Sequence, residues 1–295
     1  GSFAFQFLII KFMPQYAAVD LGSNSIRLLV ADATPEPIPQ VTRILEERQV
    51  TRLGESVFNQ GEVSKGAMES VCGVLNRMRQ MWQKYEIAGI RVVATSATRD
   101  ANNRDEFVTR ASKAIGAPVE IISGQEEARL IQLGVQSVWP HPHKRILIVD
   151  VGGGSAELIM AEDGHLMAGY SRPLGAVRLQ SAFLSNDPPS VIQIQQLQDY
   201  IQEKLSVVIS KIGGREYDRV IATSSSAAAV VCAVNKIPRT KRETADRKKA
   251  TTAQLRRLFH SLIEKSVDQR RRITGIGPRR AEIIIPGAAV LLTVL

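Results

Sequence analysis

Cysteine and histidine are scarce in this chain of 295 residues. It has four histidines and two cysteines, Cys72 and Cys232, which lie 160 positions apart. So few cysteines exclude a disulfide-stabilised scaffold and a zinc site of the Cys-x-x-Cys type. We expect both to behave as small apolar side chains. Sparse cysteine also fits a reducing compartment, so we expect a cytoplasmic protein.

Long hydrophobic runs are absent as well. The apolar stretch from Phe3 to Phe12 is too short to cross a bilayer, and we expect no membrane partner. The chain is 44% hydrophobic and 23% charged, close to the globular average, which argues against disorder and against a coiled coil. Its length predicts two domains.

Positive charge is in excess in one segment. Between Lys236 and Arg280, 15 Lys and Arg residues stand against 4 Asp and Glu, whereas the rest of the chain is close to neutral. A separated basic segment attracts polyanions by long-range electrostatics. Polyphosphate matches this charge as well as nucleic acid does, and a solvated helix face explains it too.

The chain contains an internal duplication. Residues 18–31 (AVDLGSNSIRLLVA) match residues 148–161 (IVDVGGGSAELIMA) at six of fourteen positions. Residues 91–96 (RVVATS) match residues 219–224 (RVIATS) at five of six. Two matched segments in the same order indicate two copies of one domain.

Each copy has the same pattern of strands and helices. It opens with an apolar, β-rich run, a tight turn and a second strand, and an amphipathic helix then precedes the matched strand. We therefore predict a repeated β-β-(β)-α-β unit, with the first domain over 14–137 and the second over 138–279. A C-terminal helix over about 280–295 is predicted to pack back onto the first domain.

The first turn of each copy has the composition of a phosphate-binding loop. Asp20 and Asp150 end the preceding strands, and small residues follow. Consecutive amides in such turns form a concave anion site, and glycine lets a ligand approach closely. A single turn of this kind is also typical of an ordinary hairpin, but two at duplicated positions indicate a phosphate site between the domains. The candidate phosphate-binding residues are Ser23, Asn24, Ser25, Gly152, Gly153, Gly154 and Ser155.

Several longer motifs carry a resemblance to a known family. They are VDLGSNSIRLLV, ATSATRDA, EIISGQEEARL, VDVGGGSAELI, RPLGAVRL and PRRAEIIIPGAAVLL. In combination they resemble the exopolyphosphatase/guanosine pentaphosphate phosphatase (Ppx/GppA) family of the actin-like superfamily, in its short two-domain form. The resemblance implies an α/β fold of two duplicated actin-like (ribonuclease H-like) domains with an interdomain cleft. It also implies a magnesium ion (Mg²⁺) and hydrolysis of a terminal phosphoanhydride.

Two neighbouring glutamates begin the helix that follows the EIIS strand. Ser123 and Glu126 have the spacing of a capping box, which gives Glu126 a structural role. The resemblance places the catalytic base on the next residue, Glu127. The helix dipole favours the anion in the first turn, so that this carboxylate can accept a proton from water. A purely dipole-stabilising surface acid is the alternative.

Asp150 and Glu157 flank the second turn and are the candidate metal ligands. Oxygen ligands without a histidine or cysteine partner suit magnesium. Asp20 either adds a water-mediated contact or caps its own turn. In the first copy Arg27 replaces the glutamate, so the two turns differ: the second is the metal side and the first the phosphate side.

Arg99 resembles the phosphate-contacting arginine of the family. The duplicated position holds Ala227, so the architecture does not itself require an arginine there, and a ligand role is favoured.

The predicted function is release of terminal phosphate from inorganic polyphosphate by Glu-activated water attack with Mg²⁺. One alternative is 5′-phosphate removal from guanosine pentaphosphate (pppGpp), which is disfavoured because Ser225 stands where many relatives have glycine. Another is a non-hydrolytic sensor of polyphosphate or alarmones. The expected partner is polyphosphate or pppGpp and not nucleic acid, and the resemblance leaves a homodimer open.

Overall fold

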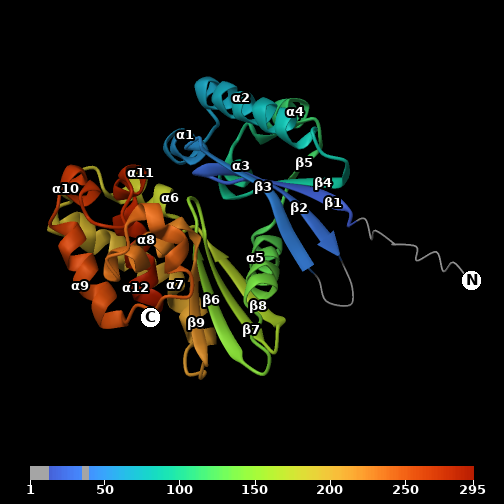
Figure 1. The fold of residues 1–295 in the computed structure, drawn as a ribbon. Coiled ribbons are helices and arrows are strands. Elements are labelled where there is room, and N and C mark those ends of the chain that lie inside the picture. Colours follow the sequence, from blue (N-terminus) through green and yellow to red (C-terminus); the bar gives the residue numbers. More distant parts are fainter. Residues whose placement is uncertain (1–12, 35–39) are drawn as a thin grey trace, which may run out of the picture.

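The computed structural model describes residues 13–34 and 40–295, and the Phe3–Phe12 stretch lies outside them. Two lobes are visible in Figure 1, each a sheet with its own helices. The first lobe contains β1 (Gln15–Leu21), β2 (Ser25–Thr34), β3 (Gln40–Val50), α1 (Leu53–Gln60), α2 (Lys65–Trp82), β4 (Ile87–Ala94), α3 (Ser96–Asp100), α4 (Arg104–Ile115) and β5 (Val119–Ile121).

The sheet of the first lobe has the order β3-β2-β1-β4-β5. Strands β1, β2 and β3 are antiparallel, whereas β4 and β5 run parallel to β1. Ala17, Val19 and Leu21 alternate with more exposed residues along β1 and join the core beneath α1–α4. This period of two is that of a strand with one buried face.

The second lobe repeats the succession of three strands, two helices and a strand. Its elements are β6 (Arg145–Val151), β7 (Ala156–Glu162), β8 (His165–Arg172), α6 (Ala176–Phe183), α7 (Val191–Ile212), β9 (Arg219–Thr223), α8 (Ser224–Val234), the 3₁₀ helix η1 (Arg239–Ala245), α9 (Thr252–Ile263), α10 (Val267–Arg271), α11 (Pro278–Ala281) and α12 (Ile284–Val294). The sheet order is β8-β7-β6-β9, with β9 parallel to β6 as β4 is to β1. The predicted duplication is confirmed in the topology.

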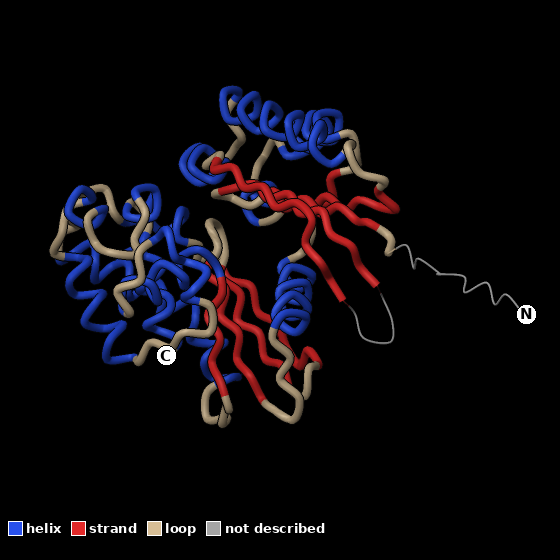
Figure 2. Tube along the Cα trace, in the orientation of Figure 1, coloured by secondary structure: helices blue, strands red, loops and turns tan. Residues whose placement is uncertain are grey.

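Both faces of the second sheet are covered. Residues 146–149 of β6 are all buried, because side chains on one face meet α6–α12 and those on the other meet α5 (Gly124–Val138). The two sheets and the helix between them can be followed in Figure 2. Continuous burial, without alternation, is the pattern of a strand enclosed on both sides.

Helix α5 follows the last strand of the first lobe but packs on the sheet of the second. Ala128, Ile131 and Val135 contact the core formed by Ile148 and Ile159. The predicted boundary between residues 137 and 138 is therefore wrong: the first core ends before α5 begins. The amphipathic pattern required a sheet beneath the helix but did not specify which one.

The C-terminal helix α12 also belongs to the second lobe. It packs against α6, α7, α8, α9 and β6, so the prediction that it returns to the first domain is wrong. Every residue from Ile284 to Leu291 is buried. A helix that is apolar on all sides needs neighbours on all sides, and the helical layer of the second lobe supplies them. Among the helices in the described ranges, none has both the length and the apolar composition needed to cross a membrane.

Candidate active site

The two predicted turns occupy equivalent places in the two lobes. In the first turn the Gly22 amide donates to the Ser25 carbonyl at 3.2 Å, and in the second the Gly152 amide donates to the Ser155 carbonyl at 3.0 Å. Each turn joins the first two strands of its sheet. The duplication therefore extends to individual hydrogen bonds.

The two turns are in contact with each other. A Cβ atom on Gly153 would lie 3.0 Å from the Asn24 amide nitrogen, and one on Gly154 would lie 2.6 Å from Oγ of Ser23. No side chain fits at either position without displacing the first turn. Glycine is needed here for close approach, and it brings the two lobes together at the base of the cleft.

The carbonyl groups of the second turn face α6. The amides of Ala176 and Val177 donate to the carbonyls of Gly152 and Gly153, each at 2.9 Å. These first amides of α6, which have no partner within the helix, thereby find acceptors. Within the described part of the chain, the amides of Gly153 and Gly154 have no backbone partner. They are the donors that the turn leaves available to an anion.

The predicted polar residues of the first turn line the cleft and also hold its shape. The Ser23 hydroxyl accepts a hydrogen bond from the Ala97 amide at 3.1 Å. The Ser25 hydroxyl accepts one from Nε of Arg48 at 3.3 Å. The backbone of Asn24 is fixed in the same way through its carbonyl, which accepts from the amides of Thr51 and Arg52 just before α1. The turn is thus shaped before any ligand arrives.

The predicted acidic pair is formed by the strand register. Asp150 lies opposite Glu157 in the β6–β7 hairpin, and Asp20 lies opposite Arg27 in the β1–β2 hairpin. The same two register positions therefore hold two acids in the second lobe and an acid with a base in the first. This asymmetry is the one predicted from the sequence.

All three candidate metal ligands have raised pKa values because they are buried. Glu157 is 1% exposed, and its Oε1 accepts a hydrogen bond from the Ser171 hydroxyl at 2.8 Å. Its pKa lies well above the ordinary value, raised by burial and then by nearby carboxylates. Burial also raises the pKa of Asp150, which accepts a hydrogen bond from Thr223, and raises that of Asp20 to about 6.

The start of α5 confirms half of the predicted capping box. Ser123 accepts a hydrogen bond from the Glu126 amide at 3.1 Å. The Glu126 carboxylate does not return to the Ser123 amide, because it binds Arg91 at 3.2 Å and Arg129 at 2.7 Å. Two cations hold Glu126 outside the cleft, and Glu127 points elsewhere.

Glu127 lies inside the cleft and bridges the lobes. Its side chain is 17% exposed, and Nη1 of Arg99 donates to Oε2 at 3.0 Å. Burial raises the pKa of Glu127 to about 7, against the opposing charge of Arg99 and with repulsion from Asp20 and Asp150. The expected stabilisation of the anion by the helix dipole does not prevail. Arg99 also donates to the Ile122 carbonyl at 2.7 Å, which places its guanidinium beside the carboxylate.

The carboxylates suit a hard divalent cation. Asp20, Glu127, Asp150 and Glu157 repel one another, and all four offer oxygen. Among the residues that the structure describes, no three His, Cys, Asp or Glu side chains are grouped closely enough to ligate one ion together. Water would therefore complete the coordination of an ion held here, as is usual for magnesium.

Four arginines that were not among the predicted site residues line the same cleft. They make only neutral hydrogen bonds, and within the described ranges none of them forms a salt bridge: Arg27 to Ser225 Oγ at 3.5 Å, Arg48 to Ser25 Oγ at 3.3 Å, Arg242 to the Ser225 carbonyl at 3.0 Å and Arg280 to Ser226 Oγ at 3.0 Å. Burial and mutual repulsion lower the pKa values of Arg48 and Arg280 to about 10. Three of the four lie in motifs or in the basic segment already noted, but nothing in the sequence pointed to Arg48.

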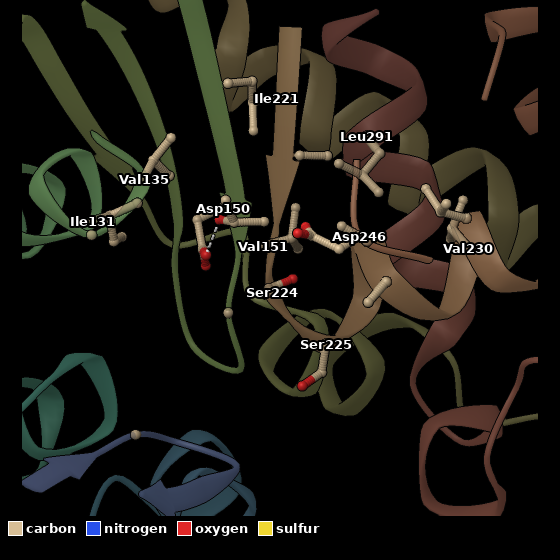
Figure 3. Close-up of a pocket in the computed structure, with 18 of the residues that line it drawn as sticks. Ile131, Val135, Asp150, Val151, Ile221, Ser224, Ser225, Val230, Asp246 and Leu291 are labelled. Atoms are coloured by element: carbon tan, nitrogen blue, oxygen red, sulfur yellow. Dashed lines mark hydrogen bonds between the residues drawn. The ribbon is translucent and has the colours of Figure 1, made fainter. Parts of the chain in front are cut away.

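The cleft between these groups has a volume of about 1150 Å³. Figure 3 shows Asp150 near its centre, with Ser224 and Ser225 on one side and the apolar residues Ile131 and Val135 on the other. The cleft brings together backbone amides that can donate to an anion, carboxyl groups with raised pKa values, and arginines that form no salt bridge within the described residues. It can bind a multiply charged anion and remove a proton from water beside it.

Comparison with known proteins agrees with this geometry. The model of the Ppx/GppA phosphatase family matches residues 29–295. The chain belongs to this family. Exopolyphosphatase 1 of Mycobacterium tuberculosis is 30% identical over 280 residues, which span 92% of this chain and 78% of that protein. Exopolyphosphatase 1 of Mycobacterium leprae is 29% identical over 273 residues, with 92% and 80% covered.

Solved structures of the family show the same fold. The PPX-GPPA enzyme of Aquifex aeolicus superposes with a TM-score of 0.78 at 26% identity, covering 95% of this chain and 91% of its own. An exopolyphosphatase from Cytophaga hutchinsonii gives a TM-score of 0.82 at 23% identity, covering 95% and 90%. The predicted α/β fold of two duplicated domains with a cleft between them is confirmed, and it is shared with these structures.

Proposed function

We propose that this Ppx/GppA protein is an exopolyphosphatase that hydrolyses the terminal phosphoanhydride of inorganic polyphosphate. The observation that carries the proposal is the place of Glu127: its carboxylate, 17% exposed and held by Arg99, lies in the cleft that the two glycine turns line. Burial raises its pKa to about 7. A base with this pKa is substantially deprotonated at neutral pH and still accepts a proton well. The mycobacterial relatives, both named exopolyphosphatase, support the choice of substrate.

Each part of the cleft has a task in this reaction. The amides of Gly153 and Gly154 bind oxygens of the terminal phosphate. Glu127 orients a water molecule and takes its proton as the water oxygen attacks phosphorus and the bridging P–O bond breaks. Arg99 holds the Glu127 carboxylate and contacts the same phosphate, so that base and substrate keep a fixed relation. Orthophosphate and a chain shorter by one phosphate result.

The proposal includes magnesium as the cofactor. Asp150 and Glu157, with Asp20 through water, would hold it, since their oxygens match the preference of a hard cation. When bound, the ion neutralises negative charge on the phosphate oxygens. The protein residues then supply orientation and proton transfer.

The unpaired arginines bind the phosphates that follow the terminal one. Arg27, Arg48, Arg242 and Arg280 repel one another, and within the described residues none of them forms a salt bridge, although Arg27 faces Asp20. A polyanion is therefore a natural counter-charge. A linear polyphosphate carries charge on every unit and can satisfy all four. This is why we favour it over a ligand with charge at one end only.

Hydrolysis of pppGpp is the second candidate, and the apolar side of the cleft supports it. Ile131, Val135, Val220 and Ala222 line the cavity next to the charged groups. Such a surface can receive the flat face of a nucleobase. The two candidates share the phosphate chemistry and differ in what lies behind it.

Phosphate release distinguishes the candidates. We would measure kcat/KM for long-chain polyphosphate, tripolyphosphate and pppGpp, each with Mg²⁺ and with EDTA. The proposal expects the highest value for polyphosphate and loss of turnover in EDTA. An equal or higher value for pppGpp would establish the second candidate. Tight binding of polyphosphate without any release would identify a sensor instead.

A further inference from the structure

The side chain of Arg178 reaches from α6 into the first lobe. Its Nε donates to the Gly154 carbonyl at 2.8 Å and its Nη2 to the Ser96 hydroxyl at 3.1 Å. The same Nη2 pairs with the Asp100 carboxylate. The guanidinium also stacks on Phe58, 4.0 Å from the ring centroid. One partner belongs to the second lobe and three to the first.

The first-lobe partners lie on the short helix that carries Arg99. Ser96 and Asp100 are the first and last residues of α3, and Arg99 precedes Asp100. Arg99 in turn holds Glu127. Helix α3 is thus contacted at both ends by Arg178, and through Arg99 it also holds the proposed base.

The turn that Arg178 holds is seated tightly in the first lobe. A Cβ on Gly154 would lie 2.6 Å from Oγ of both Ser23 and Ser96. The Arg178 side chain, 20% exposed, closes over this contact. A guanidinium has donors in a planar fork that can serve three acceptors at once, which a lysine ammonium on a flexible stem does not reproduce.

We propose that Arg178 is a positioning residue for phosphate release. It holds the second-lobe glycine turn against α3, so that the Gly153 and Gly154 amides, Arg99 and Glu127 face one terminal phosphate. The kinetic part of this inference, the effect of Arg178 on kcat, rests on the proposed function. The joint, by which Arg178 links the glycine turn to α3, does not. Arg178 itself contacts neither the water nor the base.

Kinetics of Arg178→Met and Arg178→Lys test the kinetic part. A displacement of about 1 Å of positioning groups can lower turnover by about 100-fold, so we expect kcat to fall about 10- to 100-fold while KM stays within about threefold. Lysine should restore less than a tenth of the loss, because it cannot bridge the three acceptors.

Arg52→Met is the matched control. The Arg52 side chain also joins the lobes, through Glu282 at 2.6 Å, and it contacts neither the second-lobe glycine turn nor α3. The Arg52 backbone amide, which donates to Asn24, is kept in the variant. Its kcat should stay within about twofold of the parent. Asp100→Asn removes only the charged partner, and combining it with Arg178→Met should cost no more than Arg178→Met alone. Equal kcat losses in the Arg52 and Arg178 variants, or a loss confined to melting temperature, would overturn the positioning role.

Hydrogen–deuterium exchange tests the joint without relying on turnover. Peptides over 150–158 and 95–101 should exchange faster in Arg178→Met than in the parent, and unchanged in Arg52→Met. Unchanged exchange in the Arg178 variant would overturn the inference whatever the activity. Faster exchange in a protein that releases phosphate from no substrate would uphold the joint and defeat the proposed function.

Discussion

The ionisation of Glu127 is decided by burial. A helix N-terminus contributes about 0.3–1 kcal/mol to an anion, and one pKa unit corresponds to about 1.4 kcal/mol. The dipole therefore cannot offset a rise in the pKa of Glu127 from 4.5 to about 7. Arg99 limits that rise, and the balance leaves a carboxyl group whose pKa lies near neutral pH.

Replacing Glu127 by glutamine should abolish most turnover and spare binding. The amide keeps the size of the side chain and its hydrogen bond to Arg99 but cannot accept a proton from water. We expect kcat to fall about 100- to 10,000-fold, with substrate affinity nearly unchanged. Phosphate release and equilibrium binding of labelled polyphosphate measure the two effects.

Two comparisons complete this test. Glu126→Gln, on the neighbouring residue held by Arg91 and Arg129, should keep more than half the parent rate. In the parent, kcat should rise with pH through about 7, since the base acts only when deprotonated. If Glu127→Gln retains half the parent kcat, Glu127 is not the base. The same holds if kcat of the variant still rises with pH through about 7.

Asp20→Asn should stabilise the protein at high pH. Burial raises the pKa of Asp20 to about 6, above the value of 3.8 in an unfolded chain. The folded protein therefore holds this proton more tightly than the unfolded chain does. The stability that results is fully present below about pH 4 and is lost as the pH rises through 6. The uncharged asparagine avoids that loss. Its melting temperature should exceed the parent's at pH 8, and the gap should close near pH 4.5.

Magnesium provides the control for this effect. If the ion relieves repulsion among the buried acids, it should raise the melting temperature of the parent at pH 8 more than that of Asp20→Asn. Scanning fluorimetry with MgCl₂ and with EDTA measures both. Equal shifts in the two proteins would place the ion away from Asp20.

At the scale of elements, the hairpins were predictable and the helix packing was not. A short turn between two strands fixes their register, so the facing of Asp150 and Glu157 followed from their spacing. The apolar stripe of α5 showed that it packs, but not on which sheet. Arg91, which binds Glu126, lies 35 positions earlier, so its approach depends on tertiary structure.

Gly124→Ala should displace the first turn of α5. A Cβ there would lie 2.4 Å from Cβ of Ser171, the residue that binds Glu157. The helix must shift and carry Glu127 with it, so we expect kcat to fall about 10- to 100-fold.

Gly73→Ala is the control for this substitution. Gly73 lies inside α2, where the nearest side-chain atom to a new Cβ is Nη1 of Arg77 at 3.9 Å. It should gain about 0.5–1 kcal/mol in unfolding free energy and keep its kcat. Equal kcat for the Gly124 variant and the parent would show that the turn tolerates the shift.

At the scale of the molecule, the basic segment divides into two parts. Arg242, Lys248 and Lys249 line the cleft, whereas Arg256 and Arg257 are exposed on α9 and lie outside its lining. Counting charges along the chain does not distinguish these two groups. Only the folded chain shows that one of them lines the cleft.

Changing Arg242, Lys248 and Lys249 to glutamine should raise KM for long polyphosphate more than for tripolyphosphate. Only a long chain reaches these residues while its end lies at the turns. The dependence of KM on salt should also weaken, because fewer counterions are displaced on binding. The matched variant, Arg256 and Arg257 to glutamine, should change neither. Equal losses on long and short chains would point to damage within the fold.

Helix α5 determines where this molecule can be divided. A cut between residues 137 and 138 would leave α5 attached to the wrong piece and uncover Ile148 and Ile159 on the other. A cut just before Ser123 would leave both cores whole. Two polypeptides made that way can be expressed separately and mixed, and Glu127 would then arrive on one piece and Arg99 on the other. Phosphate release would then require the two pieces to reassemble, so a division before Ser123 defines a split form of this protein.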